Sequence, residues 1–306
     1  MITSHGLHPF SKWAISEEGT EGRSGEVLAQ SQIRTKIAES PIVNAVILDF
    51  AIMEISRWCC ENSLLINPDK TKLLVISVPQ LLRSLPRLSI TILGKEIEPV
   101  SVARDLGVYI DQTLSYNEHI SKLVSSCILK HVQINRINHL LDRKTLLLMI
   151  NAFVFSKLFY CSTVWENTSK SNIKKLQLVQ NFAGKIVLGL KKFDHISQGL
   201  KSLGWLSIED KLRLNTAVIV HKCLHHRLPI NLKDKFVYRS QVHNRQLRSV
   251  DNNDLNLPHC RLSTGRTSFA FRGAKVWISL PLDLKLTPSP RTFKKDICEL
   301  FLNNLS

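Results

Sequence analysis

The chain has 306 residues, of which 44% are hydrophobic and 22% charged; this composition fits a globular protein of about two domains and excludes a wholly disordered chain. Its 41 Lys and Arg residues against 25 Asp and Glu give a formal net charge of +16, which favours a polyanionic partner, most simply the phosphates of nucleic acid. The alternatives are a basic surface that is only solvated, and a membrane surface, which is less favoured because the basic residues are spread along the chain.

Cysteine usage and hydropathy bear on location. Seven cysteines, an odd number without the spacing of a disulfide framework, predict reduced thiols and a nuclear or cytoplasmic location. The first residues lack a cationic start followed by an apolar run, so no secretory signal is expected. The most apolar stretch, residues 145–161, is interrupted by Asn151 and Lys157 and is shorter than the roughly 20 residues that cross a bilayer. It predicts a buried helix, and no membrane partner is expected.

The N-terminal part predicts a leader and then a small mixed domain. Residues 1–40 are rich in Gly, Ser, Glu and Gln and predict a disordered leader. In residues 41–115, helical spacing from Met53 predicts a helix that ends near Asn67 and Pro68. The expected strands are residues 73–78, 88–93, 96–100 and 106–110, the middle two forming a hairpin around Gly94 and Lys95.

Beyond residue 116 the apolar residues recur about every 3.6 positions, which predicts helices. The four apolar stripes are Ile120, Leu123, Val124, Cys127, Ile128 and Val132; residues 146–159; Ile173, Leu176, Val179, Gln180 and Ala183; and Leu212, Ala217, Val220 and Leu224. They predict a helical bundle over residues 116–237, followed by a basic, loop-rich extension over residues 238–306 that closes with a helix at residues 293–302. The predicted fold class is α+β, a small antiparallel sheet with one helix followed by a mostly helical bundle.

Two blocks carry a resemblance to a known family. Residues 58–72 have the sequence WCCENSLLINPDKTK, and residues 105–120 have the sequence DLGVYIDQTLSYNEHI. Together they resemble the end of the palm of a non-LTR, LINE-type retrotransposon reverse transcriptase, of the group related to jockey elements. The first block is similar to polymerase motif D, and the second is similar to the primer grip.

The resemblance continues downstream. LVQNFAGKIVLG at residues 178–189, LGWLSIED at 203–210 and HKCLHHRLP at 221–229 look like successive thumb-side blocks, and GRTSFAFRGAKVWISLP at 265–281 resembles the family's C-terminal block. The resemblance therefore implies a partial palm over residues 41–115, a thumb-like domain over 116–237 and a C-terminal extension over 238–306.

The chain departs from this family at the catalytic site. The adjacent Asp-Asp pair that would hold the two metal ions of nucleotidyl transfer is absent from all 306 residues. Tyr109, Ile110 and Asp111 could be taken for the start of that motif, but residue 112 is Gln and the surrounding block is the primer grip. AVILDF at residues 45–50 resembles the opening of motif A and makes Asp49 a candidate metal ligand, yet no room remains for the intervening palm elements. We expect no catalysis and no cofactor, although the intact family uses Mg²⁺.

Several basic residues are candidates for phosphate contact. By resemblance, Lys70 is the motif D lysine, placed near the incoming triphosphate; the alternative is a solvent-facing lysine in a turn. The arginines between residues 239 and 272 suit phosphate contact better than core packing. The candidate nucleic-acid-binding residues are Lys70, Lys72, Lys174, Lys175, Lys185, Lys191, Lys192, Arg245, Arg248 and Arg266. The expected partner is RNA, DNA or an RNA–DNA hybrid, bound through its phosphates.

A metal site is less favoured. His221, Cys223, His225 and His226 are possible ligand types, as are His259 and Cys260, but their spacing matches no closed tetrahedral set, and a packed helix face is the preferred interpretation.

Three functional hypotheses remain: a polymerase remnant without catalysis, a nucleic-acid-binding module in its own right, and a helical protein-interaction scaffold. Because the upstream palm strands are missing, Leu73, Val75 and Ile76 are expected to face solvent and to promote self-association through the uncovered sheet.

Overall fold

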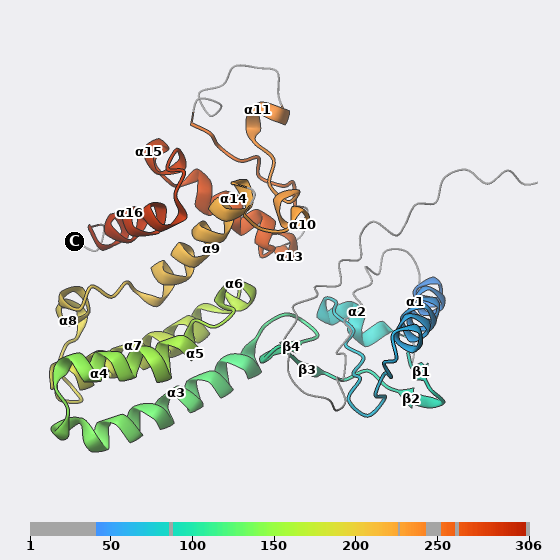
Figure 1. Ribbon diagram of the computed structural model, residues 1–306, viewed down its shortest axis with the longest axis horizontal. Coiled ribbons are helices and arrows are strands. Elements are labelled where there is room, and N and C mark those ends of the chain that lie inside the picture. The colour runs from blue at the N-terminus through green and yellow to red at the C-terminus, as the bar shows by residue number, and fades with distance from the viewer. Residues whose placement is uncertain (1–40, 86–87, 226, 243–251, 261–262, 304–306) are drawn as a thin grey trace, which may run out of the picture. The chain divides into compact units, whose positions relative to one another are not determined.

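The computed structural model describes residues 41–85, 88–225, 227–242, 252–260 and 263–303 (Figure 1). The predicted leader, residues 1–40, lies outside these ranges, as do Arg245 and Arg248. The chain divides into two compact units, with the boundary between Ala103 and Arg104. Mixed helix and sheet confirm the predicted α+β class.

The first unit is a helix packed on a hairpin. Its elements are α1 (Pro41–Glu61), α2 (Pro79–Ser84), β1 (Ile90–Ile92) and β2 (Lys95–Ile97). The two strands are antiparallel and are joined at Leu93 and Gly94, both of which have positive φ. Such a two-residue turn suits the right-handed twist of a hairpin, and glycine adopts it without strain. The small core between α1 and the hairpin contains Ile52, Cys59, Ile66, Ile90, Ile92 and Ile97.

Two predictions for this unit need correction. The first helix ends at Glu61 rather than near Asn67, because the chain turns at Ser63, whose φ is 57°. The predicted strand at residues 73–78 is wrong: only an isolated parallel bridge joins Leu73 to Pro99, and α2 begins at Pro79. A proline at the first helical position is favourable, which explains the early change to helix.

The prediction that Leu73, Val75 and Ile76 face solvent is correct only in part. Ile76 is 47% exposed, as predicted, whereas Val75 is 6% exposed and Leu73 packs beside the small core. The hairpin at residues 88–100 is confirmed, with shorter strands than predicted.

A second hairpin opens the helical unit. It pairs β3 (Val102–Asp105) with β4 (Val108–Asp111), and Leu106 and Gly107 form the turn with φ values of 42° and 86°. The strand predicted at residues 106–110 is therefore displaced, because its first two residues make the turn. The contacts group β4 with the helices that follow.

The second unit is otherwise helical. Its longer helices are α3 (Asn117–Ile137), α4 (Arg143–Ile150), α7 (Lys170–Leu188), α9 (Ile208–Leu224), α14 (Phe269–Ile278) and α16 (Pro290–Asn303). Shorter helices are α5 (Ser156–Leu158), α6 (Ser162–Trp165), α8 (Ser197–Ser202), α10 (Ile230–Lys233), α11 (Arg239–Val242), α13 (Ser263–Arg266) and α15 (Leu282–Lys285), with a 3-10 turn at Asn138–Leu140. The stretch predicted as one buried helix, residues 146–159, runs through a π-helical turn at Asn151–Phe155. No strand occurs between residues 146 and 224, which confirms the helical bundle.

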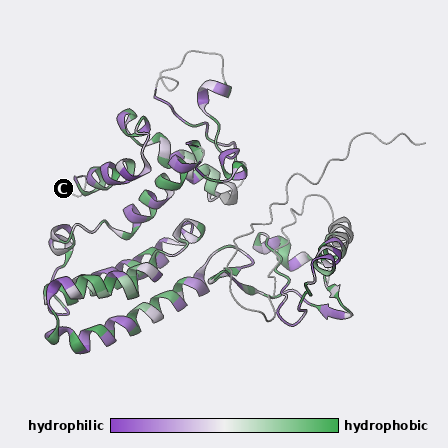
Figure 2. Cartoon of the chain, viewed as in Figure 1, coloured by the Kyte–Doolittle hydropathy of each residue, from purple (hydrophilic) through white to green (hydrophobic). Residues whose placement is uncertain are grey.

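Two hydrophobic cores hold these helices together. In the first core, α3, α4, α5 and α7 lie alongside one another, as Figure 1 shows and their contacts confirm. It includes Ile120, Leu123, Cys127, Ile150, Val154, Leu158, Trp165, Leu176, Val179, Ala183, Ile208 and Leu212. Green and purple alternate around α3 in Figure 2, which is the pattern of a helix with one buried side. Two residues of the stripe predicted on α3, Ile128 and Val132, are each 41% exposed. The buried side of this helix includes His119, His131 and Ile134, which the predicted stripe lacks.

The second core joins α9 to the C-terminal helices. After residue 269, the extension predicted to be loop-rich is therefore mostly helical and packed. It includes Leu214, Ala217, Val220, Cys223, Phe236, Leu255, Ala274, Trp277, Phe293, Ile297 and Phe301. At Gly273 an added Cβ would lie 2.8 Å from Val220 Cγ2, so only glycine allows α14 to approach α9 this closely. The closing helix predicted at residues 293–302 is confirmed as α16.

Two further findings concern the cysteines and the hydropathy of the helices. All seven cysteines are free thiols, and across the described ranges no helix has the length and apolar character needed to cross a membrane.

We expect a buried histidine to make stability depend on pH. His131 of α3 is fully buried against Phe182, with ring centroids 5.0 Å apart, and neither ring nitrogen has a hydrogen-bond partner among the described residues. Burial lowers the pKa of His131 to about 4. The unfolded side chain titrates near pH 6.5, so the unfolded state binds more protons between these values. The free energy of unfolding should be highest above about pH 6.5 and should fall as the pH falls towards 4.

His131→Leu removes the unpaired nitrogens and should raise the free energy of unfolding at pH 7 by about 1 to 2 kcal/mol. It should also flatten the loss between pH 6.5 and 4, measured by urea denaturation. His139→Leu, at an exposed position, serves as the control and should leave the acid loss unchanged. An identical acid loss in both variants would show that other groups cause it.

Candidate nucleic-acid interface

Lys70 lies in a turn that is fixed by its own sequence. The Asn67 Oδ1 atom accepts hydrogen bonds from the backbone N–H groups of Asp69, at 2.9 Å, and Lys70, at 3.3 Å. The Thr71 hydroxyl donates to the Asn67 carbonyl at 2.8 Å and closes the turn. Asparagine side chains mimic a backbone turn in this way, and Pro68 fixes one φ angle. The Asn-Pro-Asp-Lys-Thr sequence therefore holds the Lys70 backbone in a set position.

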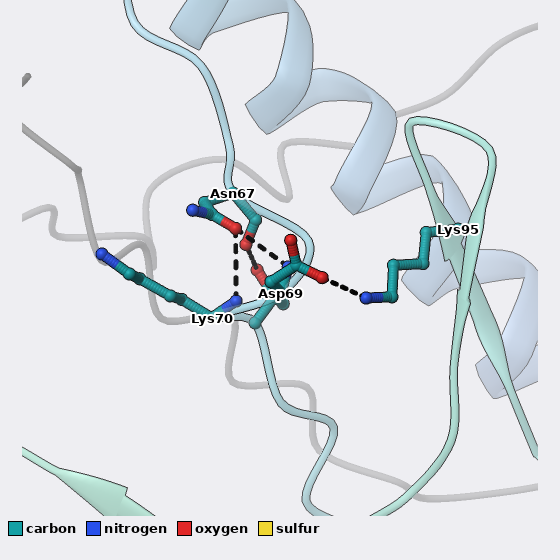
Figure 3. A network of polar contacts seen from close by, with 5 residues as sticks. Asn67, Asp69, Lys70 and Lys95 are labelled. Atoms are coloured by element: carbon teal, nitrogen blue, oxygen red, sulfur yellow. Dashed lines mark hydrogen bonds and ion pairs between the residues drawn. The ribbon is translucent and has the colours of Figure 1, made fainter.

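An ion pair holds this turn against the first hairpin. Lys95 of β2 pairs with Asp69, and its hydrogen bond and charge lower the pKa of the Asp69 carboxyl. In Figure 3 the Lys70 side chain extends away from this pair, and both Lys70 and Lys72 are exposed. Lys70 is thus an exposed ammonium on a fixed backbone. Asp49 lies within α1, where the structure describes only the backbone, whereas two-metal catalysis draws its carboxylates from neighbouring strands.

In the second unit, Asp111 is fully engaged in holding the loop that leads into α3. Oδ1 accepts from the Thr113 and Ser115 N–H groups at 3.0 Å each, and Oδ2 accepts from the Tyr116 N–H at 2.6 Å. Partial burial would raise the pKa of Asp111, but these hydrogen bonds outweigh it and lower the pKa. Asp111 is therefore a structural carboxylate.

A pocket of about 400 Å³ opens between the β3–β4 hairpin, α3 and α5. Its lining is basic and aromatic, and consists of Arg104, Gly107, Tyr109, His119, Lys122, Leu123, Ser156, Lys157 and Tyr160. No carboxylate contributes to this lining. The pocket was not predicted, because Lys157 and Tyr160 come from a stretch that the sequence marks only as a buried helix.

Contacts within the pocket position its cations. Lys122 Nζ lies 3.8 Å from the centroid of the Tyr109 ring, and Arg104 Cζ lies 5.6 Å from the same centroid, both within the range of cation–π attraction. Lys157 donates to the Ser126 hydroxyl. The Tyr160 hydroxyl donates to the Leu106 carbonyl at 3.1 Å, which ties the hairpin turn to the helical bundle.

A second group of basic residues lies on α7 and in the loop after it. Lys174, Lys175, Lys191 and Lys192 are exposed and Lys185 is partly exposed. Across the part of the chain that the structure describes, none of these five lysines forms an ion pair with a carboxylate. Within the described ranges, they are therefore cations without a carboxylate partner.

The C-terminal arginines differ from the prediction. Arg266 is exposed, but Arg272 is only 17% exposed in its side chain and pairs with Glu166, with Nη1 2.7 Å from Oε2. Arg272 also donates to the carbonyls of Thr163 and Thr267, at 3.1 and 2.9 Å. Its expected role in phosphate contact is therefore wrong: this arginine braces α14 against the bundle.

His221 lies on a packed face of α9. His221 is fully buried, stacks on Phe293 with centroids 4.2 Å apart, and places Nε2 2.6 Å from the Thr287 carbonyl oxygen. No group of three or more metal-ligand side chains gathers among the residues that the structure covers. The packing interpretation of this cluster therefore accounts for His221.

Comparison of the chain with family models, with curated proteins and with solved structures gives no match. The resemblance to LINE-type reverse transcriptases therefore rests on the sequence blocks alone.

We expect Asp111→Ala to lower the free energy of unfolding by about 2 to 4 kcal/mol, because several loop donors lose a charged acceptor. Since the pKa of Asp111 is lowered on folding, this contribution is present above about pH 4 and is lost as the pH falls through the folded pKa. Urea denaturation at several pH values measures both effects. Asp111→Asn keeps one carbonyl acceptor and should cost less, and equal stability of Asp111→Ala and wild type would contradict the structural role.

Proposed function

We propose that this chain is a catalytically incomplete part of a non-LTR retrotransposon reverse transcriptase that binds nucleic acid through phosphates. The observation that carries the proposal is the set of lysines along α7 and the loop after it, which are exposed and lack carboxylate partners among the described residues. A protein charge of +16 concentrates polyanions near such groups. The compartment would then be the nucleus or the cytoplasm.

The spacing of these lysines suits an extended partner. At a rise of about 1.5 Å per residue, Lys175 and Lys185 lie roughly 15 Å apart along α7, a span that covers several phosphates of a duplex. The Lys185 ammonium donates to the Lys192 carbonyl, which fixes the loop that carries Lys191 and Lys192. Contacts of this kind position a protein on the backbone and do not distinguish sequences.

The motifs argue against polymerization by this chain. Nucleotidyl transfer needs paired carboxylates for two metal ions, and no adjacent Asp-Asp pair occurs in the sequence. Lys70 retains the place of the motif D lysine and is available to contact phosphate. It is proposed here as a binding residue only.

A second candidate is a protein-interaction scaffold. Exposed apolar residues occur in the second half of α3 and in the turn after it, namely Ile128, Leu129, Val132, Ile137 and Leu140. Exposed Leu65, Ile76, Leu81 and Leu93 in the first unit likewise favour self-association. Binding to a partner protein that is insensitive to salt would support this alternative.

We expect duplex affinity to fall linearly with salt on a log–log plot and to depend on the α7 lysines. Changing Lys174, Lys175, Lys191 and Lys192 together to Gln should lower the slope by about 3 to 4, one for each lost contact. Fluorescence anisotropy with labelled RNA–DNA hybrid, between low and physiological salt, measures the slope.

The matched control changes Lys144, Lys201, Lys275 and Lys294 to Gln, four exposed lysines elsewhere in the same unit. It removes the same formal charge and should leave most of the slope intact. Equal slopes in the two quadruple variants would show that only net charge matters, and a flat wild-type plot would contradict the proposed function.

We also expect no primer extension by the purified chain on a primed RNA template, with either magnesium or manganese, because the metal-binding carboxylate pair is absent. A heat-treated sample sets the background, and an active reverse transcriptase confirms the assay. Template-dependent incorporation above background would sink this prediction.

A further inference from the structure

His119 leaves a buried donor at the wall of the pocket. The residue is 7% exposed, and the backbone N–H of Tyr109 donates to its Nδ1 at 3.4 Å. Because Nδ1 accepts, the neutral ring carries its proton on Nε2. That atom is buried and has no hydrogen-bond partner in the described part of the chain. Burial also lowers the pKa of His119, which keeps the ring neutral at pH 7. A buried donor without an acceptor costs free energy that a bound acceptor would recover.

The surroundings of this donor are cationic. Three cationic side chains line the same pocket: Arg104 from β3, Lys122 from α3 and Lys157 from α5. Two carboxylates adjoin these cations: Glu118 pairs with Lys122 at 2.6 Å, and Asp105, next to Arg104, lies close enough to Tyr160 to help raise its pKa. The lining itself holds three cations and no carboxylate, so it attracts a phosphate monoester, with about −1.5 to −2 charge at pH 7, more strongly than a backbone diester with its single charge.

The size and walls of the pocket fit a nucleotide. A volume of about 400 Å³ exceeds what a bare phosphate needs and falls within the usual range of small-molecule sites. The Tyr160 ring and the Leu123 side chain supply apolar wall. The Tyr160 hydroxyl already donates to the Leu106 carbonyl, so its oxygen can accept from a sugar hydroxyl.

We infer that this pocket binds the phosphate monoester of a nucleotide, carried either by a free nucleotide or by the 5′ end of a nucleic-acid strand. Arg104 and Lys157 pair with phosphate oxygens, and His119 Nε2, which is buried in the pocket wall, donates to another oxygen after a small rotation of the ring. Lys122 is shared between Glu118 and the phosphate. The inference deepens the proposed function, on which it rests for the source of the ligand, because it adds an end-specific contact to the sequence-independent contacts of α7.

The experiment titrates the full chain with adenosine monophosphate, inorganic phosphate and adenosine by isothermal titration calorimetry. We expect saturable binding of the monophosphate and no saturable binding of adenosine. Arg104→Gln and Lys157→Gln, at exposed positions, should each weaken monophosphate binding about 10-fold to 100-fold, because each removes a charge-assisted hydrogen bond. Lys130→Gln, on α3 outside the pocket, is the matched control and should bind as the wild type does.

His119→Phe tests the buried donor, since it keeps an aromatic ring and removes Nε2. The circular dichroism spectrum of His119→Phe checks its fold. If this variant fails to fold, Arg104→Gln and Lys157→Gln still test the inference. A separate anisotropy arm compares a 5′-phosphorylated hairpin oligonucleotide with its 5′-hydroxyl form. An end preference of about 10-fold, lost in Arg104→Gln, assigns the strand end as the source; monophosphate binding without end preference assigns the free nucleotide.

Absence of monophosphate binding at millimolar concentration, equal binding of adenosine, or unchanged affinity in both surface variants would overturn the inference. The calorimetric arm contains no duplex, so its failure is distinct from failure of the proposed function, which shows as a loss of salt-dependent duplex binding.

Discussion

Burial of α9 on two sides is the constraint on which the helical unit depends. Ile208 and Leu212 face the first core, whereas Leu214, Ala217 and Val220 face the second, so neither core is complete without this helix. Polar contacts set its position: the Gln177 side chain accepts from the Ile208 N–H at 2.9 Å, and the Gln180 side chain donates to the Leu206 carbonyl at 2.9 Å. Because Gln177 and Gln180 belong to α7, the helix that carries the basic residues is held by the helix that joins the cores.

Buried charges tie the C-terminal segments to this frame. Glu166 is desolvated, which raises its pKa, while Arg272 and the Thr216 hydroxyl offset part of that effect. Lys285 and Asp254 form a second buried pair, 2.7 Å apart, with side-chain exposures of 2% and 9%. Removal of one partner from such a pair leaves an uncompensated charge, so these pairs favour one arrangement of the chain over others. Arg272 and Lys285 therefore contribute little to the exposed positive charge of the protein.

The sequence was sufficient for helices whose start signals agree with their periodicity. α7 begins after Ser169 and α9 after Ser207, and each serine side chain accepts from a backbone N–H three residues later, at 3.3 and 3.1 Å. The sequence was insufficient to predict the packing of a helix that is buried on two sides. Leu212 and Ala217 were predicted to share a stripe, but they face different cores, since a helix covered on both sides has no single apolar face. The strand predicted at residues 73–78 failed for a related reason: a short apolar run does not specify a pairing partner.

Candidate site residues were predictable only where one local segment defines them. The turn around Lys70 follows from Asn67, Pro68 and Thr71 alone, and its exposure could be anticipated. The pocket could not, because Arg104, Lys122 and Lys157 are separated by up to 53 residues and converge only when α5 packs on α3 beside the hairpin. No periodicity or motif links them. The same packing buries His119, whose Nε2 has no hydrogen-bond partner among the described residues. The proposed phosphate site therefore depends on tertiary structure that the sequence blocks do not reveal.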